Sequence, residues 1–201
     1  MIAIIDYGVG NLFSLSSSLR AVGAEVVVTD DREILKKADR LILPGVGAFA
    51  DAAAKLRAGG LDGFVREQAA SGKPLLGICL GMQLLFEKSY EFGEHQGLGL
   101  IPGEIVPMQG TIPADLKIPQ IGWNRLALKG ENPLFQHIQD GDYVYFVHSY
   151  YASGCDPYVI ATTDYGIEMT AAAAHGRAHP RIARLRGRRE RRHRHRRQLQ
   201  R

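Results

Sequence analysis

The chain has 201 residues, 45% of them hydrophobic, which is enough to bury one good core and too few for a second full domain. Residues 1–176 hold 13 Lys and Arg against 20 Asp and Glu (net −7), whereas residues 177–201 hold 12 Arg against one Glu (net +11). The overall charge of +4 is the sum of these two regions. The whole-chain pI therefore describes neither of them. We expect a globular domain over residues 1–176 and an Arg-rich tail over residues 177–201.

The sequence gives no sign of secretion or membrane insertion. The first residues enter an apolar run without a charged segment or a cleavage signal, and no apolar span approaches transmembrane length. Two cysteines, Cys79 and Cys155, in a chain of this size indicate a reduced environment. We therefore expect a cytoplasmic protein.

The first half of the chain alternates strand and helix signals. Apolar runs predict buried parallel strands, and stretches of helical periodicity separate them. A further strand runs into a tight turn and a short helix. The predicted strands are 2–5, 26–28, 41–43 and 74–79, and the predicted helices are 12–22, 50–61, 65–70 and 82–87.

The second half changes character after Gly97. Proline and glycine recur at close intervals, and β-prone segments near residues 144–147 and 158–162 predict strands. Residues 177–201 lack apolar periodicity, which is typical of a disordered segment. The expected fold class is α/β, an open, mostly parallel sheet flanked by helices, with a strand-rich second half and a disordered Arg-rich tail.

Cys79 lies between two glycines where a predicted strand meets a helix. The motif GICLGMQ at residues 77–83 is typical of a turn that exposes a nucleophile. The start of the helix would favour a thiolate, and the Leu80 N–H would face a developing oxyanion. The alternative is a buried structural cysteine, the common state of unpaired Cys. Cys155 lies in an ordinary turn and we interpret it as incidental.

A second glycine-rich loop, PGVGAF at residues 44–49, follows another predicted strand. It would lie at the same carboxyl edge of the sheet as Cys79, where ligands bind in open α/β sheets. Gly45 and Val46 are candidate oxyanion donors, or the loop is an ordinary strand-to-helix turn. The IDYGVGN segment at residues 5–11 lacks the full dinucleotide fingerprint, which argues against NAD.

Taken together, these motifs resemble the class I, triad-type glutamine amidotransferases. IDYGVGN at residues 5–11, PQIGWN at 119–124 and YFVHSYY at 145–151 resemble the histidine-biosynthesis family in particular, the glutamine amidotransferase subunit of imidazole glycerol phosphate synthase. The resemblance runs from residue 1 to about residue 176. It implies a subunit that hydrolyses glutamine to glutamate and ammonia and passes the ammonia to a (β/α)₈-barrel cyclase partner, as a heterodimer.

The resemblance also assigns roles to residues. Cys79 would attack the glutamine amide, with Leu80, Gly45 and Val46 holding the oxyanion. The glutamine-binding residues would be Gln83, His148, Ser149 and Tyr150, and the face toward the cyclase would include Asn11, Gly122, Trp123 and Asn124. An exposed tryptophan is a plausible anchor, and a packed core residue is the alternative.

The base of the triad departs from the family pattern. The family supplies it from a His-Pro-Glu stretch on a late strand, and here that histidine would fall near Arg184. The single His-Pro pair begins at His179, but Arg181 follows where Glu is expected, which argues against His179 as the base. Glu190, flanked by arginines, is no better as the orienting carboxylate. The His and Glu of the triad are therefore not found.

An abrupt change of composition suggests an altered reading frame near residues 175–178. This hypothesis predicts a missing final strand and helix and an uncovered sheet surface. Two other functions stay open: a catalytically inactive docking subunit, and a nucleic-acid-binding arm in the tail, which the lack of interleaved aromatics disfavours. The residue spacing implies no metal and no redox cofactor.

Overall fold

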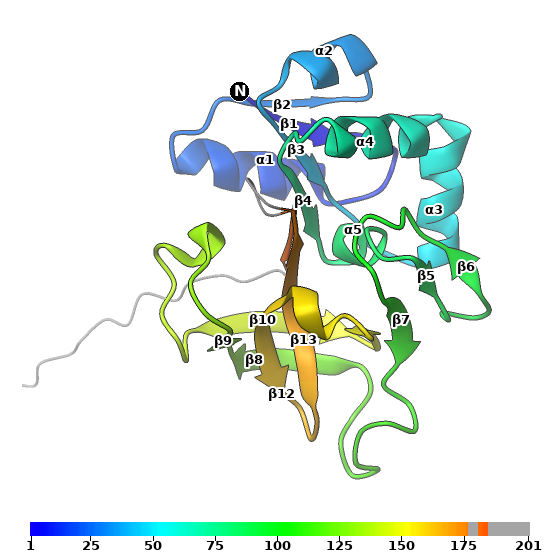
Figure 1. Ribbon diagram of the computed structural model, residues 1–201, viewed down its shortest axis with the longest axis vertical. Coiled ribbons are helices and arrows are strands. Elements are labelled where there is room, and N and C mark those ends of the chain that lie inside the picture. The colour runs from blue at the N-terminus through cyan, green and yellow to red at the C-terminus, as the bar shows by residue number, and fades with distance from the viewer. Residues whose placement is uncertain (177–180, 185–201) are drawn as a thin grey trace, which may run out of the picture.

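The computed structural model describes residues 1–176 and the backbone of residues 181–184. Its main sheet has eight strands in the order β2-β1-β3-β4-β14-β13-β12-β9 (Figure 1). Neighbours from β2 to β14 run parallel, and the remaining neighbours run antiparallel. The strands are β1 (Ile2–Ile5), β2 (Val26–Thr29), β3 (Arg40–Leu43), β4 (Leu75–Ile78), β9 (Ala127–Leu128), β12 (Val159–Asp164), β13 (Glu168–His175) and β14 (Arg181–Arg184).

Two smaller sheets occupy the second half of the chain. One pairs β8 (Gln120–Arg125) with β10 (Tyr143–His148), and the other has the order β11-β7-β5-β6. The latter contains β5 (Lys88–Ser89), β6 (His95–Gln96), β7 (Glu104–Pro107) and β11 (Tyr150–Ser153). The predicted fold class, a mostly parallel α/β sheet with a strand-rich second half, is confirmed.

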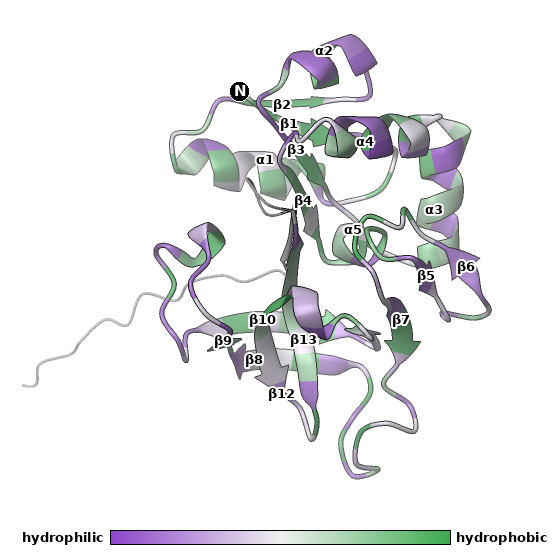
Figure 2. Ribbon diagram, viewed as in Figure 1, coloured by the Kyte–Doolittle hydropathy of each residue, from purple (hydrophilic) through white to green (hydrophobic). Residues whose placement is uncertain are grey.

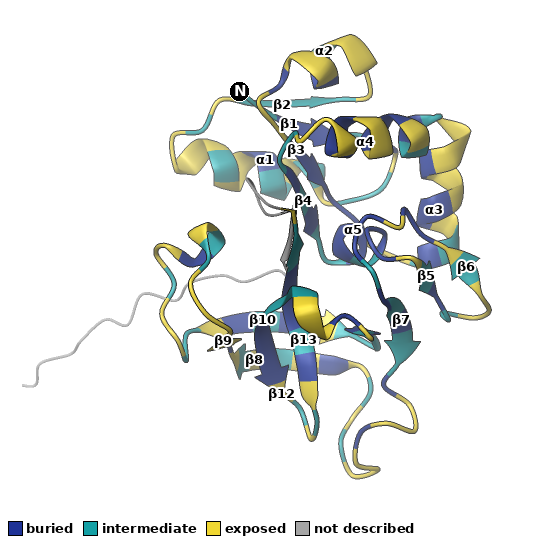
Figure 3. Ribbon diagram, viewed as in Figure 1, coloured by how far each residue is buried: buried dark blue, intermediate teal, exposed yellow. Residues whose placement is uncertain are grey.

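The helices cover the parallel strands on both sides. Helix α1 (Leu12–Ala21) lies on one side of the sheet, and α3 (Phe49–Ala58) and α4 (Leu61–Ala70) lie on the other (Figure 1). The strands are hydrophobic, whereas the outer faces of the helices are hydrophilic and exposed (Figures 2 and 3). Phe49, Leu56 and Val65 are buried under the sheet, and each such side chain contributes about 1.5–3 kcal/mol through burial.

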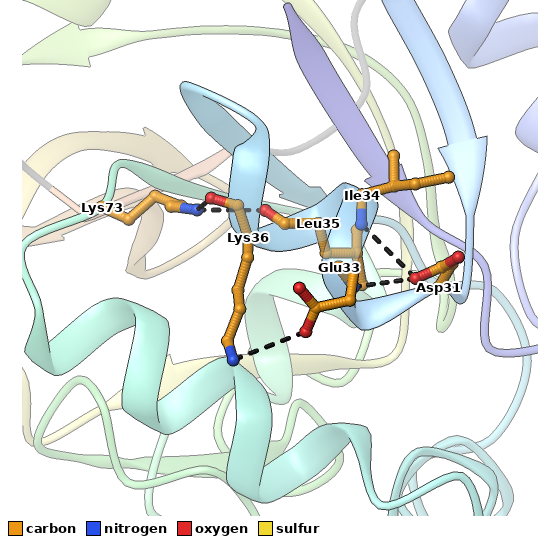
Figure 4. A network of polar contacts seen from close by, with 6 residues as sticks. All are labelled: Asp31, Glu33, Ile34, Leu35, Lys36 and Lys73. Carbon is orange, nitrogen blue, oxygen red and sulfur yellow. Dashed lines mark hydrogen bonds and ion pairs between the residues drawn. The ribbon is translucent and has the colours of Figure 1, made fainter.

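A short helix, α2 (Arg32–Lys37), was not predicted from the sequence, and it is held by polar contacts at both ends (Figure 4). At its start the Asp31 carboxylate accepts hydrogen bonds from Glu33 N at 2.8 Å and Ile34 N at 3.4 Å. At its end Lys73 Nζ donates to the Leu35 carbonyl at 3.0 Å and to the Lys36 carbonyl at 2.6 Å. A tertiary contact thus satisfies carbonyls that have no partner inside the helix.

The helix after Cys79 is shorter than predicted. The sequence predicted residues 82–87, but α5 spans Leu80–Gln83 and ends at Leu84. Leu85 N and Phe86 N instead donate three residues back, to Met82 O and Gln83 O, and Glu87 N donates to Gly103 O at 3.1 Å. Those contacts replace the helical ones and turn the chain toward β5.

The prediction that the final strand is missing is wrong, because Arg181–Arg184 forms β14 between β4 and β13. Four residues suffice to pair with both neighbours. The rest of the Arg-rich tail, 177–180 and 185–201, lies outside the described residues. The predicted disorder and the predicted absence of a final helix concern those residues and stay predictions.

Candidate active site

The loops that follow β1, β3 and β4 meet at the carboxyl edge of the parallel strands. Tyr7, from the first loop, donates a buried hydrogen bond from Oη to the Pro44 carbonyl of the second at 2.7 Å. Burial raises the pKa of the Tyr7 phenol, and the charge of Cys79 raises it further, so the phenol lies near the sulfur of the third loop. Three segments far apart in the sequence therefore converge on Cys79.

Cys79 occupies a strained backbone position between β4 and α5. Its φ of 56° and ψ of −119° lie outside the regions that non-glycine residues favour. The start of α5 fixes this conformation, because the Cys79 carbonyl accepts hydrogen bonds from Met82 N at 2.9 Å and Gln83 N at 3.2 Å. The side chain is half-buried and forms no disulfide. The sharp strand-to-helix corner expected of an exposed nucleophile is present.

Two glycines allow the loop after β3 to lie directly against this corner. A Cβ on Gly81 would lie 2.0 Å from the Leu43 carbonyl oxygen, and a Cβ on Gly45 would lie 2.5 Å from Gly81 N. Both contacts are with backbone atoms, which cannot rotate away. Glycine at these positions is therefore a packing requirement as well as a turn signal.

The candidate oxyanion residues are brought together by this contact. Leu80 is the first residue of α5, so its N–H has no acceptor within the helix, and Gly45 packs against the Leu80–Gly81 backbone. Val46 follows in an exposed part of the same loop. Helix α5 has a single turn, so its dipole supplies less positive potential than a longer helix would.

The predicted glutamine-binding residues also lie together. Gln83 Nε2 donates to the Tyr150 carbonyl at 3.4 Å, and His148 Nδ1 lies 2.9 Å from the same oxygen. Burial lowers the pKa of His148, and its ring is directed into the protein. The Ser149 carbonyl accepts from Met108 N at 2.9 Å and so fixes the strand turn. The Tyr150 carbonyl is thus the meeting point of α5 and β10.

Glu91 was not singled out from the sequence. Its carboxylate accepts a hydrogen bond from Phe49 N at 2.5 Å and caps α3, whose own residue Ala48 offers no capping side chain. Burial raises the pKa of Tyr150, and the charge of Glu91 raises it further, so Glu91 borders the Gln83 and Tyr150 cluster. The sequence offered one signal for this contact: α3 starts after an alanine, which cannot cap it, so the cap must come from elsewhere in the chain.

The ribbon of β8 and β10 presents a largely apolar face to solvent, with Arg125 at one end, where it contacts Tyr143. Trp123 is 41% exposed, which rules out the core interpretation, and its ring contacts that of Tyr145 at 5.6 Å between centroids. The paired register puts Ile121 opposite Val147 on the same face, and both are exposed. We call Ile121, Trp123, Tyr143, Tyr145 and Val147 the ribbon face.

The two asparagines predicted to face the partner make hydrogen bonds within the chain. Asn124 projects from the opposite side of β8 to Trp123, and it bonds Gln120 and the Asp164 carbonyl. Asn11 is exposed, but its Oδ1 accepts from Ser14 N at 3.0 Å and caps α1. Gly122 has no side chain, so only its backbone could contact a partner. Asn124 and Trp123 thus lie on opposite sides of β8, because side chains alternate along a strand, and their role in facing the partner stays a prediction.

The base is not found among the described residues. β14 runs parallel to β4 with Arg184 opposite Ile78, so it ends beside the turn that holds Cys79. The sequence of this strand, Arg-Ile-Ala-Arg, contains no histidine. His179 and Glu190 lie outside the described residues. Cys155 is buried near Thr170, which agrees with its interpretation as incidental.

The family model for class-I glutamine amidotransferases matches residues 3–189 of the chain. The chain is 51% identical over 178 residues to the imidazole glycerol phosphate synthase subunit HisH of Sulfurimonas denitrificans, covering 87% of the chain and 85% of that protein. It belongs to the HisH family of glutamine amidotransferases. The subunit HisH of Aquifex aeolicus is 52% identical over 165 residues, or 81% of this chain and 78% of that one.

Solved structures agree on the fold of this HisH-family chain. A crystal structure of a glutamine amidotransferase has a TM-score of 0.69 at 18% identity, covering 92% of this chain and 88% of that one. PurLQS from Thermotoga maritima has a TM-score of 0.60 at 18% identity, covering 87% and 81%. The family model reaches residue 189, past the expected end of the resemblance near residue 176.

Two features are absent from the part of the chain that the structure describes. The helices of residues 1–176 and 181–184 have neither the length nor the apolar character that crossing a membrane requires. Within the same residues, no three His, Cys, Asp or Glu side chains are grouped as metal ligands would be.

Proposed function

We propose that the chain is the glutaminase subunit of imidazole glycerol phosphate synthase. The observation that carries the proposal is Cys79, held at positive φ beside a helix start and packed against the Gly45 loop. In this reaction the Cys79 thiolate attacks the side-chain amide carbon of glutamine. Ammonia leaves with one added proton, and water then hydrolyses the thioester to glutamate.

Each neighbouring group has a role in this reaction. The Leu80 N–H and the Gly45–Val46 loop are positioned to stabilise the tetrahedral oxyanion. Gln83 and the segment from His148 to Tyr150 bind the substrate, with the negative charge of Glu91 complementary to the ammonium group of a free amino acid. These roles are supported by the packing of Gly45 against the Leu80–Gly81 backbone and by the hydrogen bond from Gln83 to the Tyr150 carbonyl.

The ribbon face supports docking on a (β/α)₈-barrel cyclase subunit that receives the ammonia. Its exposed aromatic and aliphatic side chains form the kind of apolar patch that marks a protein interface. We propose a cytoplasmic heterodimer in which this chain performs the hydrolase step and the cyclase performs the lyase step.

The missing base calls for a separate proposal. We propose that an altered reading frame near residues 175–178 has replaced the family's His-Pro-Glu segment, so that β14 occupies the right place with the wrong residues. The relatives do not support the alternative of an inactive docking subunit. The coding DNA from the Gly166 codon to the stop, translated in all three frames, should contain a His-Pro-Glu segment followed by an amphipathic helix.

Ammonia release from glutamine tests both proposals in one experiment. The chain as printed and the frame-corrected chain would each be combined with the cyclase, and each would be compared with its Cys79→Ala variant. We expect the corrected chain to turn over glutamine in a Cys79-dependent way, about 100-fold or more faster than the printed one, because a positioned base contributes about that factor. Turnover that survives Cys79→Ala would overturn the function, and equal turnover by the two chains would overturn the frame hypothesis.

A further inference from the structure

A row of three polar side chains links two backbone carbonyls across the second half of the chain. Asn124 Nδ2 donates to the Asp164 carbonyl at 3.2 Å, and Gln120 Nε2 donates to Asn124 Oδ1 at 2.9 Å. Gln120 Oε1 lies 2.9 Å from His148 Nε2, and His148 Nδ1 lies 2.9 Å from the Tyr150 carbonyl. Gln120 is fully buried, so water cannot replace its two partners, whereas the bond from Asn124 to Asp164 lies at the exposed end of the row.

The two ends of the row determine the direction of every hydrogen bond in it. A carbonyl can only accept, so the amide group of Asn124 must point to Asp164 and its oxygen must face Gln120. The amide group of Gln120 must then point to Asn124, which leaves its oxygen facing His148. At the other end the Tyr150 carbonyl, which also accepts from Gln83 Nε2 at 3.4 Å, lies 2.9 Å from Nδ1 of His148 and can only accept from it. Both ring nitrogens of His148 therefore face oxygen acceptors.

A neutral imidazole has one N–H and cannot satisfy both acceptors. If Nδ1 carries the proton, the Nε2 lone pair faces the oxygen of Gln120. If Nε2 carries it, the Nδ1 lone pair faces the carbonyl of Tyr150. The row is complete only when His148 is doubly protonated.

We propose that Gln120 and Asn124 are positioning residues that make the placement of the Tyr150 carbonyl depend on a proton carried by His148. The inference deepens the proposed glutaminase function and rests on it, because Gln83 donates to the same carbonyl. A full row holds that carbonyl from β10 and α5 together. Loss of the proton leaves one mismatched contact and loosens the substrate side of the site.

Within the described residues, the groups that contact the His148 ring are neutral. From β8 it meets the neutral amide of Gln120, on β10 the ring of Phe146 at 5.7 Å between centroids, and from β11 Tyr150. Glu91 acts on Tyr150, one residue further away. Arg125 of β8 projects to the other face, where its Nε donates to Tyr143 Oη at 2.8 Å.

Burial opposes the doubly protonated ring, and it lowers the pKa of His148. The sign follows directly: the complete row is present at pH values below this lowered pKa and is lost as the pH rises through it. Gln120→Met removes the acceptor that faces Nε2, so the ring, whether neutral or protonated, can donate from Nδ1 to Tyr150 at every pH. Gln120→Glu presents a carboxylate instead and should move the transition to higher pH.

The test is an NMR titration of the full-length chain, which does not depend on turnover. Ring ¹⁵N resonances report the protonation and tautomer of His148, and the ¹³C resonance of the Tyr150 carbonyl reports its hydrogen bonding. We expect the two to share one midpoint in the unmodified chain. That midpoint should rise in Gln120→Glu, and the Tyr150 response should vanish in Gln120→Met. Gln68→Met, which removes a buried amide from α4, is the matched control and should leave the titration unchanged.

Glutamine affinity, measured over the same pH range, separates this inference from the proposed function. We expect the Kd to rise about tenfold across the midpoint, as the loss of one hydrogen bond to a charged group implies, and to stay flat in Gln120→Met. A Tyr150 resonance that does not change at the His148 midpoint, or a Kd that does not depend on pH in the unmodified chain, would overturn the positioning role of Gln120 and Asn124. If the resonances behave as expected but glutamine binds at no pH, the row is supported and the proposed function fails.

Discussion

Replacing Gly81 with alanine tests whether the corner at Cys79 is built by close backbone contact. A Cβ there would lie 2.0 Å from the Leu43 carbonyl oxygen and 2.7 Å from the Leu43 carbonyl carbon, so β3 and α5 must separate. Helix propensity would favour alanine by about 0.5–1 kcal/mol. The clash opposes this, and forced overpacking costs about 1–3 kcal/mol or more. We expect a net loss of about 2 kcal/mol or more in the free energy of unfolding.

Gly63 is the matched control, because it lies inside α4 and a Cβ there meets nothing within 4 Å. Gly63→Ala should stabilise the chain by about 0.5–1 kcal/mol, opposite in sign to Gly81→Ala. Urea denaturation followed by circular dichroism measures both changes. Neutral surface changes alter the free energy of unfolding by about 0.5 kcal/mol or less. If Gly81→Ala changes it by no more than that, the close-contact account of the corner is wrong.

Three further changes probe other contacts. Tyr7→Phe removes the buried hydrogen bond to the Pro44 carbonyl and should cost about 1–3 kcal/mol of unfolding free energy; an unchanged urea midpoint would argue against a convergence of the two loops. Asp31→Ala removes the cap of α2 and should cost about 1 kcal/mol in the same assay, whereas Asp31→Asn should recover most of it. Trp123→Ala should weaken cyclase binding about tenfold or more in calorimetry without shifting the unfolding midpoint, and unchanged affinity would remove the ribbon face from the interface.

Periodicity predicted the architecture well because buried strands and amphipathic helices are local in the sequence. The strands 2–5, 26–28 and 41–43 and the first helices appear within a few residues of their predicted bounds. The predictions failed where contacts with distant segments of the chain determine where a helix begins or ends. The contact of Glu87 N with the Gly103 carbonyl replaces a helical bond after α5, and the Lys73 side chain supports the end of α2.

The candidate site was predictable to a similar degree. Glycine spacing identified the corner at Cys79 because close backbone approach requires glycine at fixed positions. Alternation along β8 would have separated Asn124 from Trp123, but the strand had first to be recognised. Glu91 was missed because its role comes from a contact with Phe49, 42 residues away in the sequence.

Covalent labelling by a glutamine analogue tests the central claim, that Cys79 is the nucleophile of a glutamine site. An analogue with a chloroketone in place of the amide would alkylate a thiol directly, with loss of chloride, and intact-mass and peptide mass spectrometry would locate the adduct. The account predicts one adduct per chain, at Cys79, which glutamine protects and Cys79→Ala abolishes. Buried Cys155 serves as the internal control and should stay unlabelled. Labelling of Cys155 as fast as Cys79, or labelling of Cys79 that glutamine does not slow, would contradict the claim that Cys79 is the nucleophile of a glutamine site.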